Sequence, residues 1–138
     1  GLLYHMQDPV DLLLRLGKMC QALVLETHVS LPLPLMPFIQ GKYRQHLEWK
    51  QTVRVSHGEC FTGRRNVFPA SVNMSDTSGS VDSHETFWLD QKSLRTAVQL
   101  AGFRIQAYYC GPFSKAGPRI LVDHGINRAK VFLVATKE

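Results

Sequence analysis

The chain of 138 residues has no apolar run long enough to cross a bilayer, and its first residues lack the basic start and cleavage site of a signal peptide. Its three cysteines, Cys20, Cys60 and Cys110, are widely spaced and never form a C-x-x-C pair, which is typical of reduced thiols. No two of the six histidines stand four residues apart, so we expect no metal site. Together these absences predict a cytoplasmic protein without a membrane partner.

The glycines and the charges are the next two features. Ten glycines are present, but they never form G-x-G-x-x-G or a phosphate-binding loop. The net charge is +5, and residues 87–138 alone hold eight Lys and Arg against three Asp and Glu. Four of these basic residues fall in or beside a turn-rich loop, namely Lys115, Arg119, Arg128 and Lys130. Such a loop can attract nucleic acid or an anionic substrate, or it can be an ordinary solvated loop.

Two helices have clear starts in the sequence. Asp8 is a good N-cap, and Pro9 follows at the first helical position, where a missing N–H does no harm. Asp90 caps a second helix, whose apolar face repeats at helical spacing until Gly102 supplies a left-handed stop. Apolar or alternating stretches predict strands at 22–29, 103–109 and 130–136, and residues 2–5 resemble the end of a further strand.

Residues 30–86 show no regular pattern over most of their length. Three prolines stand within six residues near the start, and a Ser/Asp/Gly-rich stretch follows later. Between them, residues 41–55 could form a short helix or a hairpin around Tyr43, Leu47 and Trp49. We therefore expect a long insertion, a lid or disorder here. A shorter loop at 111–129 has room for a strand at 120–122.

Polar side chains follow two of the predicted strands. Glu26, Thr27 and His28 end the stretch 22–29, and Tyr4 and His5 end the stretch 2–5. A right-handed crossover helix would make these two strands parallel, so both polar ends would lie at one edge of the sheet. Ligands of α/β proteins bind outside that edge, which makes these five residues candidates for a site.

Three segments, LYHMQDPVDLL, LVLETHV and FWLDQKSLRTAVQLAGF, together resemble the C-terminal half of class I S-adenosylmethionine (SAM)-dependent methyltransferases. They are most similar to the branch that includes the tRNA uridine carboxymethyltransferases, and they make up about a quarter of the chain. The resemblance implies a Rossmann-like α/β fold with a mixed sheet in the order 4-5-7-6. Residues 2–5 would end strand four, 22–29 would be strand five, 103–109 strand six, and 130–136 strand seven, which lies antiparallel between five and six.

The family's Gly-rich donor-binding half has no counterpart in these residues, so the resemblance implies that residues 1–138 are a partial methyltransferase domain. It further implies that Tyr4 and His5 border the transferred methyl group. Tyr4 would hydrogen-bond the donor carboxylate or an acceptor oxygen, and His5 would act as a base. The alternative is that Tyr4 packs on the following helix and His5 helps to cap it.

The acceptor side is implied by the same resemblance. Glu26, Thr27, His28 and Trp88 would contact the methyl acceptor, which is a small molecule or tRNA. The alternatives are a solvated strand end for Glu26 and His28, and a core position for Trp88. We expect SAM as cofactor and ordinary methyl transfer by the parent protein, with residues 1–138 alone binding SAM weakly or not at all.

Two other functions stay open at this point. A non-catalytic module could use the basic last third of the chain to hold RNA or a protein partner. A truncated product without a function of its own is the other possibility.

Overall fold

The computed structural model describes residues 2–30, 51–67, 85–111 and 128–137. Their elements are, in chain order, η1 (Leu3–His5), α1 (Pro9–Met19), β1 (Ala22–Ser30), β2 (Thr52–Ser56), β3 (Glu59–Val67), β4 (Glu85–Leu89), α2 (Gln91–Leu100), β5 (Arg104–Gly111) and β6 (Arg128–Thr136). The described residues form a mixed α/β fold, with two α-helices, one short 3-10 helix and two three-stranded sheets. The expectations for residues 41–50 and 120–122 lie outside the described residues.

The first sheet has the order β1-β6-β5. Its middle strand, β6, is antiparallel to both neighbours, with Val24 opposite Val134 on one side and Tyr108 opposite Leu133 on the other. Residues 130–136 therefore lie between the other two strands, as expected. The complete order 4-5-7-6 is not observed, because no strand pairs with the free edge of β1 among the described residues.

The expectation of a strand end at residues 2–5 is wrong, because Leu3–His5 form a short 3-10 helix. The amide of His5 donates to the carbonyl of Leu2 at 3.0 Å, and the amide of Met6 donates to the carbonyl of Leu3 at 3.2 Å. These local bonds satisfy the backbone where no neighbouring strand is paired with it. Leu3 is buried in the core as a result.

The second sheet has the order β2-β3-β4 and is antiparallel throughout. Within the stretch 30–86, which has no regular sequence pattern over most of its length, residues 52–67 form a hairpin. The two turn residues, His57 and Gly58, have φ values of 51° and 81°. Positive φ at both positions is the type I′ geometry that suits the twist of a two-residue hairpin.

Both helix starts are confirmed. The carboxylate of Asp8 accepts hydrogen bonds from the amides of Val10 and Asp11 at 3.1 and 3.0 Å. The carboxylate of Asp90 accepts a bond from the amide of Ser93 at 2.7 Å. These bonds satisfy amides that have no partner within the first helical turn.

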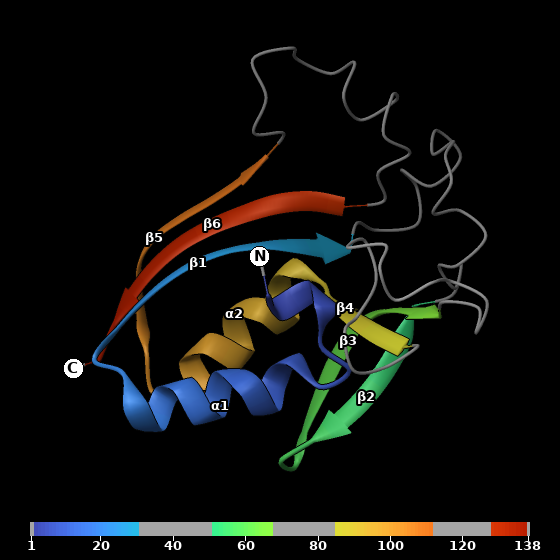
Figure 1. Ribbon diagram of the computed structural model, residues 1–138, viewed down its shortest axis with the longest axis horizontal. Coiled ribbons are helices and arrows are strands. Elements are labelled where there is room, and N and C mark those ends of the chain that lie inside the picture. Colours follow the sequence, from blue (N-terminus) through green and yellow to red (C-terminus); the bar gives the residue numbers. More distant parts are fainter. Residues whose placement is uncertain (1, 31–50, 68–84, 112–127, 138) are drawn as a thin grey trace, which may run out of the picture.

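The first sheet arches over α1 and α2, and the second sheet lies at the N-terminal ends of both helices (Figure 1). Polar contacts join the two parts there, since Ser56 on β2 meets Asp8 and Thr62 on β3 meets Asp90. The apolar core is continuous between the layers and includes Leu13, Phe61 and Leu133, which are fully buried. No helix in the described part of the chain is long and apolar enough to span a membrane.

Candidate functional site

Four rings from three elements meet at the end of β1. The rings of Tyr4 and His28 are stacked, with centroids 4.2 Å apart and planes at 22°. His5 lies 4.2 Å from Tyr4, tilted by 42°, and Trp88 meets His28 edge-on at 6.2 Å. We call Tyr4, His5, His28 and Trp88 the aromatic cluster. It brings together both predicted catalytic residues and two of the four residues predicted to contact the acceptor.

The chain path explains why these residues meet. Helix α1 leads away from η1 over a length of about 16 Å, and β1 then returns along it. The last residues of β1 therefore arrive beside η1. β4 is fixed to the same place because the indole Nε1 of Trp88 donates to the carbonyl of Tyr4 at 2.8 Å, and the amide of Phe87 donates to the carbonyl of Met6 at 3.0 Å.

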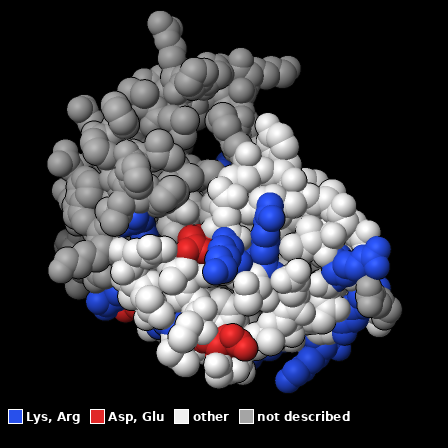
Figure 2. Space-filling model, turned by 180° about the vertical axis from the view of Figure 1, so that it is seen from behind, with Lys and Arg blue, Asp and Glu red and all other residues white. Residues whose placement is uncertain are grey.

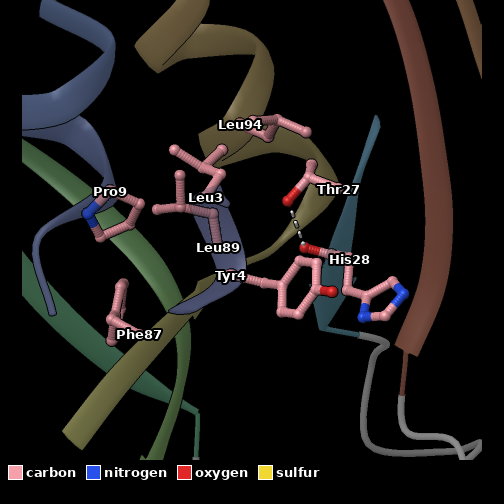
Figure 3. A pocket seen from close by; sticks show the side chains of 8 residues that line it. All are labelled: Leu3, Tyr4, Pro9, Thr27, His28, Phe87, Leu89 and Leu94. Atoms are coloured by element: carbon pink, nitrogen blue, oxygen red, sulfur yellow. Dashed lines mark hydrogen bonds between the residues drawn. The ribbon is translucent and has the colours of Figure 1, made fainter. Parts of the chain in front are cut away.

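A narrow crevice opens between the aromatic cluster and the core (Figure 3). Its lining is mostly apolar, with Tyr4 and His28 at one side and Leu94 at the other. The side chains that line it leave about 0 Å³ for a molecule the size of water, so the crevice is too narrow to hold a ligand as the described side chains stand.

Thr27 lines the crevice together with Tyr4 and His28, whereas Glu26 is not among the residues that line it. Thr27 is buried, and its hydroxyl donates a long bond of 3.5 Å to the carbonyl of His28 (Figure 3). Glu26 is exposed and pairs with Lys130 at 2.9 Å across the sheet. The pairing with Lys130 lowers the pKa of Glu26 below its ordinary value. Glu26 therefore occupies a solvated strand position.

Trp88 has the core position given above as its alternative role. It is 4% exposed, so it is a core residue as well as a member of the aromatic cluster. Tyr4 and His5 are both partly exposed. The cap of α1 is made by Asp8.

β3 contributes polar residues that the sequence analysis left unassigned. Arg64 lies directly across from Trp88 in the β3–β4 register and is 1% exposed. Burial lowers the pKa of its guanidinium, because desolvation disfavours the charged form. The alternation around Val53 and Val55, followed by His57–Gly58, was the available signal for this hairpin.

The basic residues form no continuous patch on the face shown in Figure 2, where Lys and Arg are scattered over the described surface. Of the basic loop residues, Lys130 is paired with Glu26. Lys115 and Arg119 lie outside the described residues, and the side chain of Arg128 is not described. Within the described ranges, no three His, Cys, Asp or Glu side chains form a group that could hold a metal ion.

No family model and no curated protein matches the sequence. Two solved structures share its fold. The N-terminal domain of EvdMO1 in the presence of SAH and D-fucose is 17% identical, with a TM-score of 0.57 over 100% of this chain and 45% of that chain. The same domain with SAH bound is 16% identical, with a TM-score of 0.54 over 99% of this chain and 43% of that chain.

The chain therefore has the fold of part of an SAH-binding domain, and it spans less than half the length of the structures that it matches. At this level of identity the likeness establishes the fold alone. SAH, S-adenosylhomocysteine, is what SAM becomes after it has donated its methyl group.

Proposed function

We propose that residues 1–138 are the C-terminal part of a cytoplasmic SAM-dependent methyltransferase. The observation that carries the proposal is the position of Tyr4, whose ring lies against His5 and His28 at the end of β1 in a fold shared with an SAH-bound domain. The similarity to the tRNA uridine carboxymethyltransferases in LYH and LET adds support from the sequence. We call the natural polypeptide that contains these residues the parent protein.

The described residues fit one side of a donor site. Tyr4 and His5 are partly exposed and present a hydroxyl and an imidazole beside the crevice, which suits the polar groups near a transferred methyl. The chain has no Gly-rich turn that could approach the rest of the donor. We therefore assign the remaining donor contacts to the upstream half of the parent protein.

When bound, SAM would supply an electrophilic methyl group to a nucleophile of the acceptor. The residues of this chain would position the acceptor and take up its proton. Tyr4 would orient an oxygen by hydrogen bonding, and His5 would accept the proton. Holding two reactants in line can lower the activation free energy by about 7–11 kcal/mol. Positioning the acceptor is therefore a larger contribution than taking up its proton.

The methyl acceptor is a small molecule or tRNA in this proposal. EvdMO1 was crystallised in the presence of D-fucose, which makes a sugar one acceptor to test. His28 and Trp88 would form the acceptor wall of the site. We assign no acceptor contact to Thr27, whose hydroxyl is hydrogen-bonded to the carbonyl of His28, and only a peripheral one to Glu26, which is held by Lys130.

Calorimetry with SAH on the parent protein tests the donor site, and transfer of labelled methyl from SAM to small-molecule and tRNA fractions tests the reaction. Tyr4→Phe removes only the hydroxyl, so we expect at least a tenfold lower rate of methyl transfer with unchanged thermal stability. Tyr109→Phe is the matched control, because Tyr109 is exposed on β5.

A parent protein without a saturable SAH site would contradict the proposal. RNA binding that weakens steeply with salt, in the absence of SAH binding, would instead support a basic RNA-binding module.

A further inference from the structure

Two polar side chains face each other across β3 and β4 and have no hydrogen-bond partner among the described residues. Asn66 and Thr86 are directly opposite in the register, and each is 1% exposed. Within the part of the chain that the structure describes, neither Oδ1 nor Nδ2 of Asn66 has a partner, and the hydroxyl of Thr86 has none. Buried polar groups almost always have partners, so an unpaired set in one place points to a group that binds there.

The pair lies next to the aromatic cluster on the same face of the second sheet. Asn66 follows Arg64 by two residues, and Thr86 precedes Trp88 by two, so all four side chains lie on one face of the sheet. The Asn66–Thr86 pair is about 7 Å along the strands from the Arg64–Trp88 pair. The opposite face carries Phe61 and Phe87, which belong to the core.

The charged groups around the pair are few. Arg64 shares its face, whereas Arg65 and Glu85 alternate onto the other face and pair with each other at 2.7 Å. The pair therefore has a cation on its own face and no carboxylate there among the described strands.

The chemistry of the pair restricts what can bind. The Asn66 amide needs both an acceptor for its N–H groups and a donor for its oxygen, and the Thr86 hydroxyl can serve in either role. A carboxylate or a phosphate only accepts, so it would leave the Asn66 oxygen unpaired. Hydroxyl groups donate and accept together, and the neighbouring Trp88 ring offers an apolar surface for the carbons that carry them.

We propose that Asn66 and Thr86 bind two neighbouring hydroxyl groups of the methyl acceptor, which is then a sugar-like polyol. The identification of the bound polyol as the methyl acceptor rests on the proposed function. Binding of its hydroxyl groups by Asn66 and Thr86 does not require methyl transfer. Trp88 would connect this site to the aromatic cluster, because its indole is bonded to the Tyr4 carbonyl and meets the His28 ring.

Ligand-detected NMR on the parent protein tests the site with three probes: D-fucose, uracil and inorganic phosphate. We expect D-fucose to bind, and we expect Thr86→Val to weaken its binding about tenfold while thermal stability stays equal or rises, since the lost hydroxyl has no partner. Asn66→Ala should weaken binding at least as much. Thr96→Val, on α2, is the matched control and should leave D-fucose affinity unchanged.

Preferential binding of uracil or phosphate would overturn the assignment to a polyol, and so would D-fucose binding that Thr86→Val leaves intact. A fall in stability for Thr86→Val without any probe binding would show that the pair has a structural role only. SAH calorimetry on the same samples separates the proposed polyol site from the proposed methyl transfer. SAH binding without D-fucose binding refutes this site alone, and D-fucose binding without SAH binding refutes the proposed methyl transfer alone.

Discussion

A single carboxylate, Asp90, joins the second sheet to the start of α2. One oxygen accepts from the amide of Ser93 at 2.7 Å, and the other accepts from the side chains of Thr62 and Gln51. The backbone amide of Asp90 also donates to the carbonyl of Thr62 at 2.9 Å. The residue is thus a helix cap and a tertiary contact at once.

Replacing Asp90 by alanine should cost about 2 kcal/mol of unfolding free energy or more, because the cap and the charge-assisted bond to β3 are lost together. Urea denaturation followed by circular dichroism measures the change. Glu59→Ala, an exposed acidic residue in the same hairpin, should change stability by less than about 0.5 kcal/mol. Equal effects of the two substitutions would refute the role given to Asp90.

The Glu26–Lys130 ion pair should make the stability of the protein depend on pH. Its lowered pKa means that folded Glu26 stays ionised to a lower pH than unfolded Glu26. The contribution to stability is therefore present above the ordinary glutamate pKa and is lost as pH falls through the lowered value. It should be small, because the side chains are 53% and 44% exposed.

NMR titration of the Glu26 carboxyl is the direct measurement. In Lys130→Met the pKa of Glu26 should rise toward its ordinary value, while Lys18→Met, on the exposed side of α1, should leave it unchanged. No rise in Lys130→Met would mean that the ion pair does not persist in solution.

The close crossing of α1 and α2 is the main feature at the scale of elements. Gly17 lies where a Cβ atom would overlap the backbone carbonyl of Ala101 at the end of α2. A glycine inside a helix is unfavourable for that helix alone. Here it lets the two helices approach each other beneath the first sheet.

Gly17→Ala should therefore destabilise the protein by about 1–2 kcal/mol, although alanine favours the isolated helix by about 1 kcal/mol. The overlap is with backbone, so no side chain can rotate to relieve it. Thermal unfolding measures the loss, and Lys18→Ala is the control in the same turn. A gain in stability would show that the helices do not cross this closely.

At the scale of the whole molecule, the chain covers 43% of a domain solved with SAH bound and lacks a Gly-rich turn. Among the described strands, none lies along the second edge of β1, which carries a single parallel bridge between Ser30 and Asp90. Such an edge is where a further strand of a larger sheet could add. The candidate site lies at the end of that same strand.

We predict that the 138-residue chain binds SAM at least about tenfold more weakly than the parent protein does, because the proposed function gives these residues only one side of the donor site. Calorimetry on both proteins measures this, and circular dichroism must show that the shorter chain is folded. Micromolar SAM binding by the shorter chain would place the donor site within these residues and refute the prediction.

The sequence by itself determined the elements whose signals are local. Asp8 and Asp90 mark the starts of two helices by side-chain bonds within one turn, and the apolar stretches at 22–29 and 130–136 predict buried strands. Strong local patterns of this kind need no knowledge of the rest of the chain.

Only the tertiary structure decided the rest. Leu3–His5 have strand-like composition, but without a paired neighbour their backbone closes a 3-10 turn. The meeting of Tyr4 with His28 and Trp88, and of Asn66 with Thr86, joins residues 20 to 84 positions apart. Contacts of that kind depend on strand register and on the return of β1 along α1, and no local spacing of residues encodes either.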